Sequence, residues 1–515
     1  MKKKIIAGVL SASMLLCSVE ALPSSFLSSI GTGVTVEAAV ANGFEYKLLS
    51  DGTVEIIRYT GSSENVTIPE MLARKYVSRI GDAAFYMSNV KTVTIPATVK
   101  NIGNDSFRES AYLTDVKFLG TTRIDSYAFY KCTSLKNVSL NAGLNKIDDY
   151  VFYGCSALKN IVIPDTVTSI GGYCFENCSS LESVTLSKEL TEISDDTFAW
   201  CTSLKSIRIP NKVKSVGWRA FSSCTALTQV IMPNSLKTIS DEAFDRCNHL
   251  EKLSIPNSVT TIGDGAFENC TGLLDVVIPD SVTKIGKNAF GYIHATNSKV
   301  YEKIEKFAIC GTTPVAQKYA EDNKFKFIDI RLSKGSVSLN KTVYVYNDNG
   351  VNADVVVKNS AGDVLKAGTD YELSYADNKK CGKATVTVNG KGKYIETVSE
   401  NFIITPAKIT GVKVKSPKVK RVKVTWKKAN GEVTGYEIQI ARNKKFTKSL
   451  KTIDIKKANI SKKTIKKLKS KKKYFVRVRA YKTIDNTKYY GNWSKIVSKK
   501  VKGKKAKSKK TKSNK

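Results

Sequence analysis

The fold is decided by the stretch Leu158-Lys-Asn-Ile161-Val-Ile163-Pro164-Asp-Thr-Val167-Thr-Ser-Ile170-Gly171-Gly-Tyr-Cys174-Phe175-Glu-Asn-Cys178. Its apolar positions return in register in the next copy but one, at Leu204, Ile207, Ile209, Pro210, Val213, Val216, Gly217, Phe221 and Cys224. One such unit cannot bury its own apolar side, so a repeated apolar pattern of this length predicts a solenoid of stacked coils with a shared core.

A phenylalanine marks each copy, at a step of 22 residues twice and then 23 residues seven times: Phe85, Phe107, Phe129, Phe152, Phe175, Phe198, Phe221, Phe244, Phe267 and Phe290. The alternation Leu-x-x-Ile-x-Ile predicts a short parallel strand, which Pro ends because it lacks a ladder donor, and Ile-Gly predicts a turn. In three copies another pair of residues stands in place of the strand-ending Ile-Pro, namely Phe118-Leu119, Leu140-Asn141 and Leu186-Ser187. We therefore expect about ten coils with short parallel strands.

The wider pattern Ile-Pro-x-x-Val-x-x-Ile-Gly-x-x-Ala-Phe-x-x-Cys resembles the BspA-type family of leucine-rich-repeat surface proteins. The resemblance implies a leucine-rich-repeat solenoid over residues 42–328. It also implies terminal caps, at residues 43–56 before the array and at residues 307–311 with a short helix near 314–323 after it. Adhesion to host matrix proteins or to other bacteria is the function that the resemblance implies.

Seven of the eleven cysteines stand three residues after a phenylalanine: Cys132, Cys155, Cys178, Cys201, Cys224, Cys247 and Cys270. Equivalent side chains in adjacent coils point in parallel about 4.8 Å apart, which is too far for the Cβ atoms of a disulfide. A linear file also fails to supply tetrahedral zinc ligands. We favour a spine of buried thiols that donate to backbone carbonyls, with a disulfide ladder as the alternative.

Two β-sandwich domains are predicted after the repeats, which makes the fold class multidomain and mainly β. Over residues 329–406, strands such as Ala384-Thr-Val-Thr-Val, the run 371–378 and Gly390-Lys-Gly392-Lys-Tyr394 resemble bacterial immunoglobulin-like modules. Residues 407–501 resemble a fibronectin type III domain, on the evidence of Trp426, Leu468, Tyr474 and Trp493-Ser494. Trp426 is expected in its core, and Leu468 with Tyr474 at a tyrosine corner.

Residues 1–41 predict a signal peptide, because Met1-Lys2-Lys3-Lys4 precedes an apolar run from Ile5 to Val19 that is short for a spanning helix. Small-residue cleavage sites stand at 19–21, around 38–39 and at 39–41, and the later ones are favoured. Cys17 lies in the apolar run without a lipidation motif. No later segment is apolar enough to span a membrane, so the protein is expected to be secreted or held at a bacterial cell surface.

The net charge of +37 is concentrated near one end. Residues 407–515 hold 39 Lys and Arg against 4 Asp and Glu, and residues 502–515 predict a disordered polybasic tail. Export and the lack of an aromatic platform in the tail argue against specific nucleic-acid binding. We expect this end to bind anionic cell-wall polymers or lipid headgroups, with solubility alone as the competing explanation.

No catalytic, metal or cofactor site is predicted. The only two histidines, His249 and His294, lie in different coils outside any metal or nucleophile motif, and the acidic residues are scattered over turns. The sequence therefore favours a binding protein over an enzyme, although an enzyme with an unrecognised site is a weaker alternative.

The candidate ligand surface is formed by strand residues that stand between the buried positions and face outward. Most of these residues are small and polar, which suits a protein or glycan ligand. A structural spacer of the cell envelope is the competing function. The predicted ligand-binding residues are Asp115, Lys117, Asn137, Ser139, Asn160, Ser183, Thr185, Ser206, Arg208, Gln229, Lys252, Ser254 and Asp275, with the apolar Val162, Ile231 and Val277 in the same file.

Overall fold

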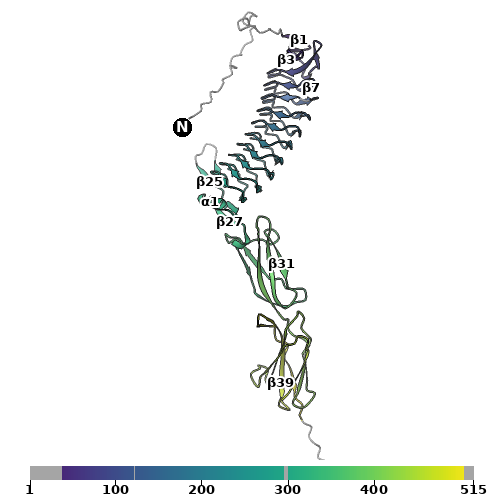
Figure 1. Ribbon diagram of the computed structural model, residues 1–515, viewed down its shortest axis with the longest axis vertical. Helices are drawn as coiled ribbons and strands as arrows, with labels where there is room; N and C mark the ends of the chain where they lie inside the picture. Colours follow the sequence, from purple (N-terminus) through teal and green to yellow (C-terminus); the bar gives the residue numbers. More distant parts are fainter. Residues whose placement is uncertain (1–37, 121, 295–299, 504–515) are drawn as a thin grey trace, which may run out of the picture.

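The structure is a computed structural model that describes residues 38–120, 122–294 and 300–503. These residues are mainly β, and they form a solenoid and two β-sandwiches that follow one another along a single axis (Figure 1). The predicted fold class is therefore confirmed, whereas the predicted domain boundaries stay predictions. Residues 1–37 of the predicted signal peptide and residues 504–515 of the predicted tail lie outside the described residues.

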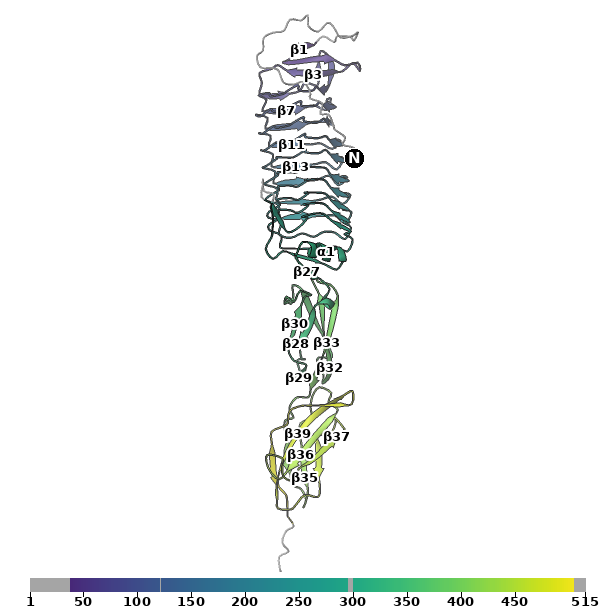
Figure 2. The same ribbon diagram turned by 90° about the vertical axis from the view of Figure 1, so that its left-hand side faces the viewer.

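The Leu-x-x-Ile-x-Ile segments form the first strand row, one of two rows along the solenoid (Figure 2). Its strands are parallel and in register where they pair, so that Val116 lies between Val93 and Val138. The copies without Ile-Pro keep their strands. The first strand row comprises β4 (Asn65–Thr67), β7 (Thr92–Ile95), β9 (Asp115–Phe118), β11 (Asn137–Ser139), β13 (Asn160–Val162), β15 (Ser183–Thr185), β17 (Ser206–Arg208), β19 (Gln229–Ile231), β22 (Asp275–Val277), β26 (Ala308–Gly311) and β27 (Lys326–Asp329).

The residues that precede each Ile-Gly turn form the second strand row. Gly217 shows why glycine follows several of these strands: a Cβ there would lie 2.8 Å from the backbone nitrogen of Asp195 in the preceding coil. The second row comprises β3 (Val54–Tyr59), β6 (Lys75–Ile80), β8 (Asn101–Ile102), β10 (Arg123–Ile124), β12 (Lys146–Ile147), β14 (Ser169–Ile170), β16 (Glu192–Ile193), β18 (Ser215–Val216), β20 (Thr238–Ile239), β21 (Thr261–Ile262) and β23 (Lys284–Ile285).

The ten phenylalanines from Phe85 to Phe290 are stacked along the core of the solenoid. Neighbouring ring centroids lie 4.7 to 5.5 Å apart and the rings are nearly parallel. All ten side chains are buried. Burying a side chain of this size stabilises the fold by about 1.5–3 kcal/mol. Because each ring packs on the rings of the next and previous coils, this stabilisation depends on the neighbouring coils.

The turn that carries each phenylalanine holds residues in the left-handed backbone region, which the sequence analysis did not predict. Tyr127, two residues before Phe129, has φ 60°, and Lys131, two residues after it, has φ 53°. Gly154 takes the latter position in the next coil, with φ 69°. Side chains other than glycine are strained there by about 1–2 kcal/mol each, so the turn geometry is imposed by coil packing rather than by local preference.

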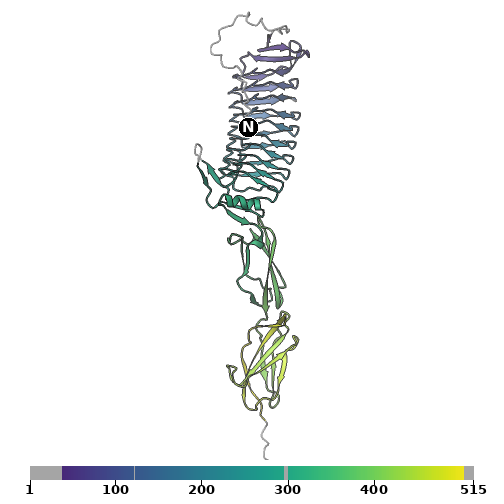
Figure 3. The same ribbon diagram turned by 60° about the vertical axis from the view of Figure 1, so that its left-hand side comes forward.

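Both ends of the solenoid are closed. At the first end, β1 (Ala39–Ala41) and β2 (Phe44–Leu48) form an antiparallel sheet with β3, and β5 (Met71–Leu72) pairs with β6. At the other end, α1 (Pro314–Asp322) covers the last coils, which confirms the predicted helix (Figure 3). Thr313 caps α1 by accepting a hydrogen bond from the Ala316 amide at 3.3 Å. A hairpin of β24 (Tyr292–His294) and β25 (Tyr301–Lys303) lies nearby.

Each sandwich pairs two antiparallel or mixed sheets around its own apolar cluster. The first has β28 (Ser336–Leu339) and β30 (Val355–Lys358) in one sheet, and β29 (Val343–Val345), β33 (Thr397–Thr405), β32 (Gly382–Gly390) and β31 (Tyr371–Ala376) in the other. The short helix η1 (Leu332–Lys334) precedes it. The second has β34 (Lys413–Lys415), β35 (Val422–Thr425) and β38 (Lys462–Ile465) in one sheet, and β37 (Lys451–Ile455), β36 (Gly435–Ala441), β39 (Lys473–Ile484), β40 (Thr487–Tyr490) and β41 (Val497–Lys500) in the other.

Candidate functional site

The repeat cysteines form a buried file in which each thiol bonds to the backbone. The Sγ of Cys178 donates to the carbonyl oxygen of Phe152 at 3.2 Å, and the other six make the equivalent bond at 3.0 to 3.3 Å. In an earlier coil, Ser110 donates to Phe85 in the same way. The ten cysteines of the described residues are free and buried, and burial raises the pKa of Cys224 to about 12. The predicted thiol spine is confirmed, and its role is structural.

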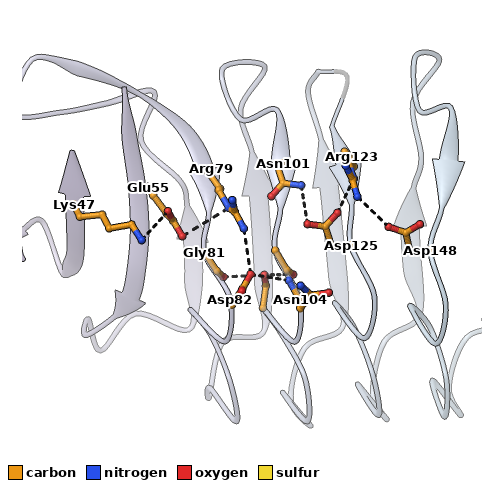
Figure 4. A network of polar contacts seen from close by, with 12 residues as sticks. Lys47, Glu55, Arg79, Gly81, Asp82, Asn101, Asn104, Arg123, Asp125 and Asp148 are labelled. Atoms are coloured by element: carbon orange, nitrogen blue, oxygen red, sulfur yellow. Dashed lines mark hydrogen bonds and ion pairs between the residues drawn. The ribbon is translucent and has the colours of Figure 1, made fainter. Parts of the chain in front are cut away.

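Charged residues along the second strand row pair with one another from coil to coil (Figure 4). The buried carboxylate of Glu55 lies 3.1 Å from the Lys47 ammonium and 3.7 Å from the Arg79 guanidinium. Two coils further on, the guanidinium of Arg123 lies 3.6 Å from the Asp148 carboxylate. These charges stabilise the stack of coils, so this part of the second row offers few uncompensated groups to a ligand.

The predicted ligand residues lie on one surface of the first strand row, which we call the outward face. Twelve of the thirteen are exposed and Asp115 is half-buried, whereas the alternate residues Val116, Ile161 and Ile207 are buried. The strands place Asp115 and Lys117 on β9, Asn137 and Ser139 on β11, Asn160 on β13, Ser183 and Thr185 on β15, Ser206 and Arg208 on β17, Gln229 on β19 and Asp275 on β22. Lys252 and Ser254 lie in a segment without strand structure.

That segment, residues 251–256, interrupts the first strand row. β19 pairs with β17, and β22 pairs with β26, so neither continues into the segment between them. A groove of about 630 Å³ lies there, lined by Gln229, Lys252 and Ser254 among its polar residues and by Met232 among its apolar ones. Within the part of the chain that the structure describes, the side chains of Gln229, Lys252 and Ser254 form no hydrogen bond or ion pair. An amide, a cation and a hydroxyl beside an apolar wall suit a protein or glycan ligand.

Other predicted residues are occupied by contacts within the protein. Asp115 accepts a hydrogen bond from Asn137 at 2.6 Å, and the hydroxyl of Ser183 donates to Asn160 at 2.5 Å. The carboxylate of Asp275 lies 2.7 Å from the Lys393 ammonium of the first sandwich. The structure therefore gathers Gln229, Lys252 and Ser254 at the groove and makes Asp275 part of a domain junction.

Two family models match the chain. The model described as BspA type Leucine rich repeat region (6 copies) matches residues 78–205 and 191–309, and the Fibronectin type III domain model matches residues 407–499. The chain carries BspA-type leucine-rich repeats and a fibronectin type III domain. Both predicted resemblances are thereby confirmed, and the immunoglobulin-like assignment of residues 329–406 stays a prediction.

Solved structures similar to the chain include two bacterial leucine-rich-repeat proteins. A leucine rich cell surface protein from Faecalibacterium prausnitzii A2-165 is 27% identical, with a TM-score of 0.39, and the match covers 53% of this chain and 88% of that one. A leucine-rich repeat protein from Bacteroides ovatus ATCC 8483 is also 27% identical, with a TM-score of 0.42, over 56% of this chain and 66% of that one. No curated protein gave a significant match.

The leucine-rich repeats also hold two carboxylates that the sequence analysis did not single out, the half-buried Glu176 and the buried Asp196. Burial raises the pKa of Glu176 to about 7. It raises the pKa of Asp196 to about 6, because desolvation outweighs the attraction of the Arg219 guanidinium 3.7 Å away. The repeat register could have pointed to Asp196, because this carboxylate takes the position two residues before the phenylalanine that Tyr150 and Tyr173 hold in earlier coils.

The type III domain has the core that its sequence predicts. Trp426 is buried in the apolar cluster, and the Tyr474 hydroxyl accepts a hydrogen bond from the amide of Lys469 at 3.1 Å, as expected at a tyrosine corner. His249, in the repeats, is an exposed turn residue as predicted, with its ring Nδ1 2.6 Å from the Thr225 carbonyl. Among the described residues, none of the helices is both long and apolar enough to cross a membrane.

Proposed function

We propose that this is an exported, non-catalytic surface protein whose leucine-rich repeats bind an extracellular protein or glycan through the outward face, with the groove at residues 251–256 as the centre of the site. The observation that carries the proposal is the groove itself, where the unpaired side chains of Gln229, Lys252 and Ser254 lie beside apolar residues at a segment that forms no strand. Solenoids present extended surfaces of this kind to their ligands.

The proposal includes retention at the cell surface through the basic residues 407–515. The composition of this region supports retention, because it contains 39 basic and only 4 acidic residues. The partner is an anionic polymer of the cell wall, to which the protein binds electrostatically. Such binding weakens as rising salt screens the charges.

A spacer of the cell envelope is the second candidate function, and one junction favours it. Ala308 and Cys310 of the last coils share an apolar cluster with Val388 and Tyr394 of the first sandwich. A continuous core across the junction stiffens the connection between the two parts. The spacer function needs no ligand on the outward face, so a binding measurement separates the two candidates.

The test compares the full chain with two triple variants on a panel of immobilised extracellular matrix proteins and glycans. Salt at about 0.5 M suppresses attraction to the basic end. The groove variant Q229A/K252A/S254A should lose at least about ten-fold in affinity for whichever panel member the protein binds. The matched control K237A/T238A/T261A changes residues in and beside the second strand row of the same coils and should bind as the unmodified protein does.

Equal binding by the groove variant and the control would contradict the assignment of the groove. Binding of the unmodified chain to isolated cell walls alone, with no panel member retained, would favour the spacer function. Unchanged melting temperatures of both variants would show that the comparison reports on binding rather than on folding.

A further inference from the structure

The acidic residues on the strands of the type III domain are confined to one of its two sheets, whereas basic residues lie on both. Glu437 pairs with Arg479 at 2.8 Å, and Asp454 pairs with Lys488 at 2.6 Å, all on the sheet of β36, β37, β39 and β40. The remaining two acidic residues of the domain, Glu432 and Asp485, lie in loops outside the strands. The sheet of β34, β35 and β38 therefore carries no carboxylate.

The outer surface of that sheet consists of lysine and threonine. Val422 and Val424 of β35 are fully buried, so the alternate residues Lys423 and Thr425 face outward. Their partners on the neighbouring strands complete two rows across the sheet: Lys413, Thr425 and Lys462 form one, and Lys415, Lys423 and Thr464 form the other. These six residues are named the lysine face.

The lysine face is electrostatically uncompensated. Lys415 and Lys423 are direct cross-strand partners, and like charges in such a pair destabilise a sheet. Over the described residues, none of the four lysines of the face forms an ion pair. A bound polyanion would relieve this repulsion, and two rows about 6.8 Å apart, with about 4.8 Å between strands, can hold successive anionic groups of one flexible chain.

The composition of the face selects among polyanions. Its strands contain no aromatic residue on which a base could stack, which disfavours nucleic acid. Among the described residues, none of the exposed large apolar side chains lies on β34, β35 or β38, which disfavours insertion into a bilayer. We propose that the lysine face is the binding site for a phosphodiester-linked polyol polymer of the cell wall; this rests on the retention included in the proposed function and assigns it to one sheet.

The test measures binding of the full chain to a synthetic glycerol-phosphate oligomer over a series of salt concentrations. The face variant K413Q/K415Q/K423Q/K462Q should bind at least about ten-fold more weakly, and its plot of log affinity against log salt should be shallower by about 3 to 4. The matched control K444Q/K445Q/K448Q/K495Q removes four exposed lysines outside the face and should bind within about three-fold of the unmodified chain. The variant with four arginines, K413R/K415R/K423R/K462R, should retain binding.

Several outcomes would overturn the assignment. Equal losses in the face variant and the control would show that net charge alone sets the affinity, and retention would stand without the lysine face. Loss of binding in a chain that ends at Gly503 would assign the site to the tail instead. Tighter binding to duplex DNA, or to vesicles of phosphatidylglycerol, than to the oligomer would reject the polymer as partner. No binding of the unmodified chain to the oligomer or to cell walls would reject retention itself, while the panel result for the repeats is unaffected.

Discussion

The Sγ of Cys178 is both a core atom and a hydrogen-bond donor to Phe152 in the preceding coil. In C178A the Phe152 carbonyl loses this donor and a cavity forms, so we expect the stability to fall by about 1–3 kcal/mol. C178S should lose less, because Ser110 makes the same bond in an earlier coil at 2.7 Å. Urea unfolding of the two variants measures the difference. A C178S protein as unstable as C178A would show that the thiol acts only by filling space.

The half-buried carboxyl of Glu176 should make stability depend on pH. Desolvation raises its pKa to about 7 from the usual 4.5, so the folded state holds the proton more tightly than the unfolded state does. This contribution to stability is fully present below about pH 4.5 and is lost as the pH rises through 7. E176Q should therefore raise the melting temperature at pH 8 and leave it nearly unchanged at pH 4.

A matched substitution isolates that effect. Glu192 on β16 is exposed, and E192Q should change the melting temperature by the same small amount at both pH values. A gain in E176Q that is equal at pH 4 and pH 8 would refute the role of desolvation.

At the scale of the element, the phenylalanine turn combines a fixed geometry with residues that do not prefer it. Met87 and Gly154 take the same position two residues after a phenylalanine, with φ 52° and 69°. Met87 is exposed, so M87G should relieve strain and raise stability by up to about 1 kcal/mol. G154A should lower it by about 1 kcal/mol or more. Chemical denaturation checks both, and a shift of the two variants in the same direction would contradict the assignment of strain.

The strands themselves were predictable from the sequence, whereas their pairing was not. In Asn160–Val162 and Ser206–Arg208 the central apolar residue is buried and its two neighbours are exposed. This follows from the sequence, because successive side chains of a strand point to opposite faces. Residues 251–255 have the same alternation, yet no strand forms there. Pairing depends on the positions of both neighbouring coils, and one coil's sequence does not contain that information. For this reason the residues of the outward face were predicted, but the groove and the junction contact of Asp275 were not.

The left-handed turns escaped prediction for a related reason. Residues that favour this conformation take these positions in only some coils, as glycine at Gly154 and Gly265 and as asparagine at Asn177, Asn269 and Asn288. Other coils have residues such as tyrosine, lysine or tryptophan there, which do not signal it. Backbone strain at those residues is tolerated because stacking of the phenylalanines fixes the coil on both sides.

At the scale of the whole molecule, the solenoid and the type III domain are separated along the axis by the first sandwich (Figure 1). The groove belongs to the solenoid and the lysine face to the type III domain. The solenoid joins that sandwich through a shared apolar cluster and through the ion pair of Lys393 with Asp275. Under the proposed function, this arrangement lets one end be held at the wall while the outward face is presented to a partner.

The most direct test of the outward face labels one introduced cysteine at a time, because the buried native thiols should not react. Ser254 at the groove and Lys237 near the second strand row of a neighbouring coil are both exposed. S254C and K237C are made in separate full chains, each also carrying C17S, and are treated with a bulky neutral maleimide polymer. The ten buried cysteines should not react. We expect the labelled S254C protein to lose binding to the extracellular partner that the unmodified chain binds, and the labelled K237C protein to keep it. Full binding by the labelled S254C protein would contradict the account.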